Sequence, residues 1–219
     1  MTLILTNEEI ESVFTLDECF GVLEPALLDL GSGRAVSMPR QDLLVPGPLP
    51  DSYHGLKTSC AALPRAGITT LRVTSDVLTW PSIAGKQRRV KVPLAGGSKY
   101  VGLVLLFSTA TGELLAIFPD GLMQAIRVGV TNALSAKYLA RKNSSVMALY
   151  GSGWQAGPAL LAMCKVLPIR EVRVFSPTEE HRTVFARKMS EDIDVRVHPA
   201  SSPKVAAQGA DIVALATNA

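Results

Sequence analysis

The stretch Val146-Met-Ala-Leu-Tyr-Gly-Ser-Gly-Trp-Gln-Ala156 joins an apolar, strand-like run to a glycine-rich turn. The turn reads G-x-G-x-x-A, with Gly151, Gly153 and Ala156 at the three small positions. The first glycine permits a tight turn, the second lets a pyrophosphate approach the backbone, and the small third residue lets a helix pack on the strand. The helix that follows would offer free N–H groups and a positive dipole end to phosphate. Because such turns also occur in plain loops, the neighbouring sequence must decide between the two interpretations.

The residues that follow the turn have the pattern of a βαβ unit. A helix-compatible apolar run spans residues 158–167, and Glu171–Phe175 has the composition of a second strand. The whole unit is about 30 residues long, as a βαβ element requires. We therefore predict a dinucleotide-binding turn formed by Gly151, Ser152, Gly153, Trp154, Gln155 and Ala156.

The alternation of strands and helices continues to the end of the sequence. Ser176-x-x-Glu179 predicts the capped start of a helix, and further elements are expected at residues 195–197, 203–208 and 212–216. This βαβαβαβ order predicts an α/β fold with a Rossmann-type doubly wound parallel sheet over residues 143–219. Because a complete domain of this kind usually has six strands in its sheet, we expect a sheet that is incomplete at the C-terminus and a longer natural chain.

The first part of the sequence, residues 1–142, predicts an α+β domain. Thr15-x-x-Glu18 predicts the start of a helix that ends at Gly31, and Asp120 is expected to cap a long apolar helix. Residues 76–92 have the composition of an exposed loop or hairpin with a solvated basic run. The other expected elements are a short helix at residues 6–13 and extended segments at 35–45, 55–63, 68–74, 100–108 and 113–118.

The composition excludes several classes of protein. With 219 residues, 47% of them hydrophobic and 19% charged, the sequence is typical of a globular protein, and its net charge of +3 is too small to indicate nucleic-acid binding. No apolar run approaches the roughly 18 residues of a membrane span, and the N-terminus lacks a signal peptide pattern. Three isolated cysteines indicate reduced thiols in a cytoplasmic protein, and the scattered histidines indicate no metal site.

Several segments together resemble the ornithine cyclodeaminase / mu-crystallin family. The resemblance covers most of the chain and is firmest from residue 100 onward. It implies a homodimer in which the N-terminal part forms a dimerisation and substrate domain. The segments that carry it are Gly102–Phe107, Thr111–Ala116, Asp120, Arg127-Val-Gly, Leu139-Ala-Arg141, Tyr150–Ala156, Gly209–Val213 and Ala216-Thr217.

The resemblance also implies an NAD(P)-linked reaction on a small amino or imino acid. The first alternative is a cyclodeaminase, in which bound NAD⁺ takes a hydride from ornithine and returns it to give proline and ammonia. The second is a reductase of cyclic ketimines or an alanine dehydrogenase-like enzyme. The third belongs to another class, a non-catalytic protein that keeps the nucleotide site, as crystallins do.

Two arginines correspond to the family's substrate-binding positions. Arg40, in Met38-Pro39-Arg40, matches the arginine that binds the substrate carboxylate, and a guanidinium can hold a carboxylate with two parallel hydrogen bonds. Arg127 matches the arginine of the family's R-T-A motif, here Arg-Val-Gly. Arg40 could instead be a surface arginine. Because Arg127 lies among apolar helix residues, we expect a buried guanidinium that needs a partner, either the substrate or an acid such as Asp120.

The family's active-site lysine has no direct counterpart. It lies on the strand that fits Thr69–Thr74, where Arg72 stands in this sequence, and the nearby Lys57 falls where the family has a methionine. We assign Arg72 to the catalytic position. An arginine stays protonated near neutral pH, so this change argues against cyclodeamination but not against carboxylate binding. The family's catalytic aspartate would lie beyond Ala219.

The end of the second strand of the predicted βαβ unit bears on the choice of cofactor. An NAD site has an acidic residue there for the ribose 2′-hydroxyl, whereas this chain has Ser176-Pro177-Thr178, with Arg182 one turn further on. This pattern favours NADP over NAD. The alternative is that Ser176 merely caps the next helix. Ala216 and Thr217, after the last strand, complete the predicted cofactor contacts.

Overall fold

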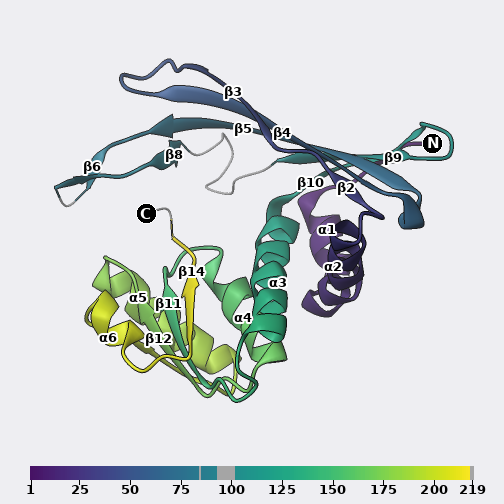
Figure 1. Ribbon diagram of the computed structural model, residues 1–219. Helices are drawn as coiled ribbons and strands as arrows, with labels where there is room; N and C mark the ends of the chain where they lie inside the picture. Colours follow the sequence, from purple (N-terminus) through teal and green to yellow (C-terminus); the bar gives the residue numbers. More distant parts are fainter. Residues whose placement is uncertain (84, 93–101, 218–219) are drawn as a thin grey trace. The chain divides into compact units, whose positions relative to one another are not determined.

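The computed structural model describes residues 1–83, 85–92 and 102–217, which form two compact units (Figure 1). The first unit comprises residues 1–15 and 24–123, and the second comprises residues 16–23 and 124–217. The domain boundary that the sequence predicts after residue 142 stays a prediction.

The first unit is built on an eight-stranded sheet with the order β1-β10-β9-β5-β4-β2. Strand β3 also pairs with β4, and β8 pairs with β5. All pairings are antiparallel except that of β1 with β10. The strands are β1 (Leu3–Ile4), β2 (Val36–Ser37), β3 (Gln41–Pro46), β4 (Tyr53–Leu63), β5 (Ile68–Thr79), β8 (Val90–Val92), β9 (Leu103–Ser108) and β10 (Leu114–Pro119).

A long hairpin, β4 and β5, dominates this sheet. The 3₁₀ turn η1 (Pro64–Ala66) closes it, and Gly67 leaves the turn at a φ of 69°, in the left-handed region that favours glycine. β5 continues to Thr79, so the expectation of a loop or hairpin from residue 76 is wrong for its first four residues. The short strands β6 (Ser82–Ile83) and β7 (Lys86–Gln87) then pair as a hairpin. Residues 100 and 101 of the expected strand 100–108 lie outside the described residues.

The first helix of the chain begins at a residue whose side chain caps it. Helix α1 (Asn7–Val13) starts at a complete capping box, in which Thr6 and Glu9 each accept the other's backbone N–H. Helix α2 (Leu16–Gly31) begins directly after Thr15, and α3 (Gly121–Leu139) begins directly after Asp120. The capping roles predicted for these two residues stay predictions. None of the helices in the described part of the chain has the length and hydropathy that a bilayer crossing requires.

The second unit contains a four-stranded parallel sheet with the order β13-β12-β11-β14. This confirms the Rossmann-type fold predicted from the sequence. The strands are β11 (Val146–Tyr150), β12 (Glu171–Phe175), β13 (Arg196–Pro199) and β14 (Ile212–Leu215), and the helices between them are α4 (Ala156–Val166), α5 (Glu179–Asp192) and α6 (Pro203–Ala207).

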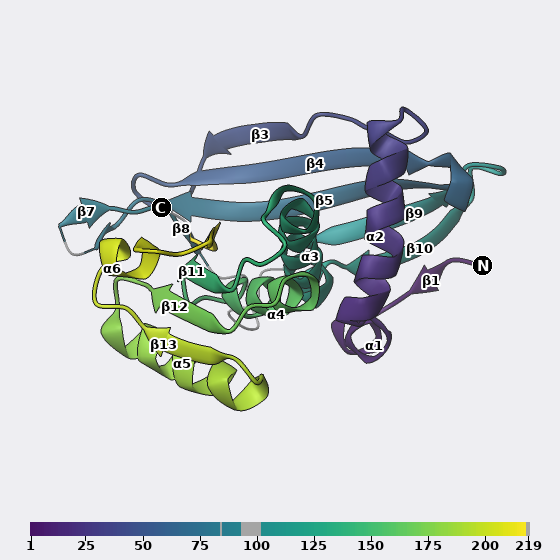
Figure 2. The ribbon, with the colours of Figure 1, turned by 60° about the horizontal axis from the view of Figure 1, so that its bottom comes forward.

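Side-chain alternation on β11 places a helix layer on each face of this sheet. The chain runs from β11 through α4 to β12 and then into α5 (Figure 2). Met147 and Leu149 point to the face that α4 and α5 cover, where Leu160 and Met163 complete a buried core. Ala148 points to the other face and packs against α6. The strand order reverses between β11 and β14, and ligands of doubly wound sheets bind at the carboxyl ends of strands beside such a reversal.

Candidate functional site

The turn after β11 needs glycine at its first small position for reasons internal to the fold. Gly151 has a φ of 111°, and its N–H donates to the Phe175 carbonyl at 2.8 Å. A Cβ at this position would lie 2.1 Å from the carbonyl oxygen of Ala216. The backbone after β14 therefore closes against the turn after β11, and only glycine fits between them.

Gly153, the second glycine, is under no such constraint. A Cβ built at this position meets nothing within 4 Å among the described atoms. The protein itself therefore does not require glycine at residue 153. This open space is what a pyrophosphate needs to approach the backbone, so the turn fits a dinucleotide.

The start of α4 presents its backbone donors without a side-chain cap. Gln155 occupies the N-cap position in a helical conformation and makes no capping hydrogen bond. Ala156 is fully buried in the core, which lets the helix pack closely on the sheet. Trp154 is exposed at the turn, whereas the Ser152 hydroxyl is held at 2.9 Å by the Ser176 hydroxyl. An uncapped helix start beside an open glycine has the donors that bind a phosphate group.

The loop after β12 is held together by Arg182. Its guanidinium donates to the Ser176 carbonyl at 3.0 Å, lies 5.8 Å from the centre of the Phe175 ring and pairs with Glu179 at 3.4 Å. Only 11% of the Arg182 side chain is exposed. The predicted cap at Ser176 is wrong, because Thr178 occupies the N-cap position of α5 and the buried Ser176 hydroxyl bonds to Ser152 and the Thr178 carbonyl. No described residue from 176 to 178 is acidic.

The strand β14 brings its end beside the same turn. The Ala216 N–H donates to the Tyr150 carbonyl at 2.7 Å, so Ala216 and Thr217 follow β14 next to Gly151. At the other end of the strand, Asp211 accepts hydrogen bonds from the backbone N–H groups of Ser145 and Val146 at 2.8 and 3.1 Å. These bonds, followed by one from Arg141, lower the pKa of Asp211 below its usual range. The turn after β11, the loop after β12 and the end of β14 therefore place the predicted cofactor residues at the ends of these three strands.

The first unit carries a charged face on one side of its sheet. In the register of the strands, Asp42 on β3 lies opposite Lys57 on β4, and Lys57 lies opposite Thr74 on β5. Arg72 and Asp76 share this face, because they lie two residues before and after Thr74 on the same strand. Arg40 and Asp120 reach the face through ion pairs.

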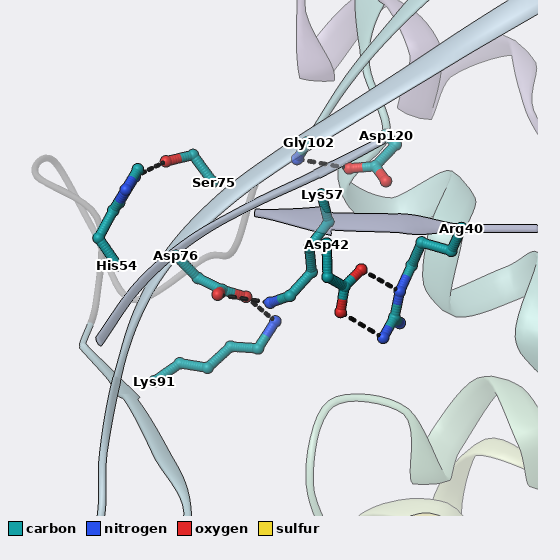
Figure 3. A network of polar contacts seen from close by, with 9 residues as sticks. All are labelled: Arg40, Asp42, His54, Lys57, Ser75, Asp76, Lys91, Gly102 and Asp120. Atoms are coloured by element: carbon teal, nitrogen blue, oxygen red, sulfur yellow. Dashed lines mark hydrogen bonds and ion pairs between the residues drawn. The ribbon is translucent and has the colours of Figure 1, made fainter. Parts of the chain in front are cut away.

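The most enclosed group of this charged face is a cluster of Lys57, Asp76 and Lys91, which we name the Asp76 cluster (Figure 3). The two ammonium groups lie 2.6 and 2.7 Å from different oxygens of the Asp76 carboxylate. The exposed fractions of the side chains are 1% for Asp76, 14% for Lys57 and 43% for Lys91. Burial by itself raises the pKa of Asp76, but hydrogen bonds and charges from the two lysines outweigh it and lower that pKa.

Sequence reasoning missed this cluster. Lys91 belongs to the basic run that we interpreted as a solvated face, and Lys57 was considered only as a neighbour of the predicted catalytic position. The alternation of polar residues along β5, at Arg72, Thr74 and Asp76, could have indicated a polar sheet face. Their partners on β4 and β8 depend on strand register, which the pattern does not contain.

Arg72, the predicted catalytic residue, is held by a buried carboxylate. Its Nε donates to Asp120, whose side chain is 4% exposed. The other oxygen of Asp120 accepts the Gly102 N–H at 2.6 Å (Figure 3). A Cβ on Gly102 would lie 2.8 Å from the Asp120 carboxylate and 2.6 Å from Thr74. The Asp120 carboxylate therefore joins β5, the start of β9 and the start of α3. The catalytic role of Arg72 stays a prediction.

The two predicted substrate-binding arginines occupy different surroundings. Arg40 is exposed and holds Asp42 with two parallel hydrogen bonds of 2.7 and 2.8 Å, so its guanidinium already has the bidentate geometry that a substrate carboxylate would use (Figure 3). Arg127 lies on α3 in the second unit and is exposed. The expectation of a buried guanidinium at Arg127 is wrong. Asp120 forms an ion pair with Arg72. A pairing of Arg127 with Asp120 stays a prediction.

The cysteines of the second unit are unsuited to thiolate chemistry. Burial raises the pKa of Cys164 to about 11, and burial also raises that of Cys19, against the opposing charge of Arg127. Both thiols therefore stay protonated near neutral pH. Among the described residues no group of three or more metal-binding side chains occurs.

Comparison with known protein families identifies the family of this chain. The model of the ornithine cyclodeaminase/mu-crystallin family matches residues 89–219, more than half of the sequence. The chain belongs to this family, which confirms the resemblance inferred from its motifs.

The names of individual relatives indicate different activities. An alanine dehydrogenase of Archaeoglobus fulgidus is 29% identical over 200 residues, covering 91% of this chain and 56% of that protein. A Delta(1)-pyrroline-2-carboxylate reductase of Bacillus cereus is 32% identical over 118 residues, covering 54% and 36% of the two chains. An archaeal alanine dehydrogenase dimer with bound NAD has a similar structure, with a TM-score of 0.77 and 28% identity over 99% of this chain and 60% of that one. The chain spans little more than half the length of the first two curated relatives it matches.

Proposed function

We propose that the protein binds NAD(H) or NADP(H) and moves a hydride to or from the α-carbon of a small amino or imino acid. The observation that carries the proposal is the contrast within the turn after β11. Gly151 is locked against Ala216 by the fold, whereas Gly153 faces open space at an uncapped helix start. A glycine that the protein does not need for its own packing is best explained by a ligand that approaches the backbone.

The bound nucleotide would supply hydride chemistry, and the chain's own residues would hold it. The N–H groups at the start of α4 would bind the pyrophosphate beside Gly153, and the loop of Ser176, Pro177 and Thr178 would border the adenosine ribose. The NAD in the similar archaeal alanine dehydrogenase structure supports a nucleotide in this domain. The lack of an acid in the loop supports NADP over NAD, which stays a prediction.

The substrate end of the proposal rests on the first unit. Arg40 would bind the substrate carboxylate by exchanging Asp42 for it, since both present the same two oxygens to a guanidinium. Arg127, which is exposed, is the second proposed substrate contact. Names such as alanine dehydrogenase and pyrroline-2-carboxylate reductase among the relatives support chemistry at an α-carbon next to a carboxylate.

Cyclodeamination of ornithine is the second candidate activity, because the family name includes it. The arginine in place of the family's lysine argues against it, since a guanidinium does not exchange protons near neutral pH. Full-length protein should be assayed with ornithine and NAD⁺, with alanine and NAD(P)⁺, and with a cyclic imino acid and NADPH. Proline formation without net cofactor turnover would identify a cyclodeaminase, and net nucleotide turnover with either of the others would identify a dehydrogenase or reductase.

A binding experiment tests the proposal independently of substrate choice. Titration of the protein with NADH and NADPH, followed by nucleotide fluorescence, should show saturable binding to at least one of them. Binding without turnover on any amino or imino acid would favour the non-catalytic, crystallin-like alternative. Absence of binding to both nucleotides would contradict the proposal.

A further inference from the structure

A hollow of about 480 Å³ opens in the first unit, where the loop between β3 and β4 meets the end of β5. Its lining includes Leu49, Asp51, Ser52, Tyr53, Trp80 and Gln87. None of these residues belongs to the Asp76 cluster or to the proposed cofactor and substrate contacts. The volume is in the range of small-molecule sites in proteins. The hollow therefore has space for a ligand that the proposed reaction does not account for.

Two aromatic rings form a corner of this hollow. Tyr53, the first residue of β4, and Trp80, which follows β5, have ring centres 5.8 Å apart and ring planes at 87°. Both residues remain partly open to solvent, with exposed fractions of 46% and 37%. The face of an aromatic ring attracts a cation that lies within about 6 Å of the ring centre. Two nearly perpendicular rings therefore give an organic cation both an apolar contact and an electron-rich face.

The loop between β3 and β4 adds a carboxylate to the hollow. Among the described residues of the lining, Asp51 is the only charged one, and it is exposed. In the described part of the chain, no cation pairs with its carboxylate. Asp51 has a φ of 52°, in the left-handed region that aspartate and asparagine tolerate better than most residues.

The conformation of this loop is fixed by its own hydrogen bonds. Ser52 is buried, and its hydroxyl donates to the Leu49 carbonyl at 2.6 Å and accepts the Leu49 N–H at 3.0 Å. The Gly47 N–H donates to the Ser52 carbonyl at 2.8 Å. Asp51 therefore belongs to a loop that needs no ligand to take its shape, which lowers the cost of binding.

We propose that this hollow binds a small organic cation whose ammonium group carries methyl groups. The methyl groups would contact the rings of Tyr53 and Trp80, the positive charge would lie over an aromatic face, and Asp51 would neutralise it. An anion would be repelled by Asp51. A metal ion such as calcium would find one carboxylate where it needs roughly six or more oxygen ligands. The proposal goes beyond the hydride chemistry proposed above, because it requires neither nucleotide nor amino acid.

Choline and 3,3-dimethylbutan-1-ol isolate the role of the charge, since the alcohol replaces the nitrogen of choline with carbon and keeps its shape. Full-length protein labelled with ¹⁵N should show a saturable shift of the Trp80 indole N–H signal on titration with choline at constant ionic strength. We expect the alcohol to bind at least about tenfold more weakly than choline. Equal affinity for the two compounds, or no saturable shift with choline, would overturn the proposal.

Substitutions of the ring and the acid test whether these residues form the site. Trp80→Leu should weaken choline binding at least about tenfold, and Trp80→Phe, which keeps a ring, should recover part of the loss. Asp51→Asn should weaken binding about threefold, and asparagine tolerates the positive φ of this position. Asp194→Asn, at an exposed acid of the second unit, is the matched control and should leave the affinity unchanged.

Broadening of the choline methyl signal measures binding in the variants that lack the indole, and the melting temperature shows whether each variant is folded. Wild-type choline affinity in a folded Trp80→Leu protein, or in Asp51→Asn, would place the cation elsewhere and overturn the proposal. If Trp80→Leu does not fold, the comparison of Asp51→Asn with Asp194→Asn decides.

Discussion

The two glycines of the turn after β11, Gly151 and Gly153, have different structural surroundings. Gly151 is required by the approach of Ala216, whereas none of the described atoms lies within 4 Å of a Cβ at Gly153. Alanine at the two positions should therefore produce different defects.

The first prediction compares these two alanine variants. Gly151→Ala should destabilise the protein by at least about 2 kcal/mol, because its Cβ would clash with a backbone carbonyl and its φ is positive. Gly153→Ala should keep the wild-type melting temperature and weaken nucleotide binding at least about tenfold. Gly157→Ala, where the nearest atom is 3.8 Å away, is the control and should change neither. If the Gly153→Ala variant bound the nucleotide with wild-type affinity, the assignment of this turn to the nucleotide site would be contradicted.

The second prediction concerns the ion pair of Arg72 and Asp120. Arg72→Ala would leave the buried Asp120 carboxylate without its cation, which should cost about 3 kcal/mol in the free energy of unfolding. Arg72→Lys keeps a positive charge and should lose less. Urea unfolding of both variants measures the difference. If Arg72→Ala unfolds like the wild type while nucleotide turnover is lost, Arg72 acts in the reaction and not in the fold.

At the scale of elements, Asp211 joins the start of β14 to the start of β11. Its carboxylate accepts two backbone N–H groups, and their hydrogen bonds lower its pKa. Because the pKa in the folded protein lies below the unfolded value of about 3.9, the stabilisation is complete above that pH. It is lost as the pH falls through the lower, folded pKa.

The third prediction follows from this sign. Asp211→Asn should lower the urea midpoint at pH 7, and the difference from the wild type should narrow as the pH falls below about 4 towards the lower, folded pKa. Parallel denaturation series from pH 7 to pH 3 measure it. A gap between the two proteins that stays constant over this range would show that the charge of Asp211 contributes nothing.

The fourth prediction concerns the loop between β12 and α5. Ser176→Asp combined with Arg182→Ala should shift the ratio of NADP to NAD affinity towards NAD by about tenfold, because an acceptor is added for the ribose 2′-hydroxyl and a phosphate partner is removed. Arg187→Ala, an exposed arginine further along α5, serves as the control. Since Arg182 also holds the Ser176 carbonyl, the melting temperature should be recorded beside the affinities. An unchanged ratio of NADP to NAD affinity in a folded double variant would contradict the predicted preference for NADP.

At the scale of the whole molecule, the homodimer implied by the family resemblance stays a prediction, and strand β3 offers a surface for it. Leu43, Leu44 and Val45 are exposed on this strand, which pairs only with β4 among the described strands. Exposed apolar strands at a sheet edge are normally covered by another chain or segment.

The fifth prediction tests this surface. We expect the full-length protein to sediment as a dimer and Leu43→Glu to weaken the dimer at least about tenfold, because a carboxylate would be buried without a partner. Val184→Glu, an exposed apolar position on α5, should have no effect. A Leu43→Glu protein that remains dimeric would place the interface elsewhere, and a monomeric wild type would contradict the dimer itself.

Arg127 shows where sequence reasoning about α3 stopped being reliable. It lies seven residues before Leu134, nearly on the same helical stripe, so the apolar pattern placed both in the core. Leu134 is buried, but Arg127 is exposed. Periodicity identifies which residues share a face of a helix. Periodicity does not tell which part of that face is covered by neighbouring residues and which part is exposed to solvent.

The amino-acid sequence by itself determined the turn after β11 and the parallel sheet around it. These features depend on contacts between residues close in sequence and on the regular alternation of strand and helix patterns, and both can be recognised in the sequence. Only the tertiary structure decided which charges meet. Lys57 pairs with Asp76 across a hairpin, and Arg72 pairs with Asp120 at a separation of 48 residues. Such pairs depend on strand register, and shifting the register by one residue would turn every side chain to the opposite face of the sheet.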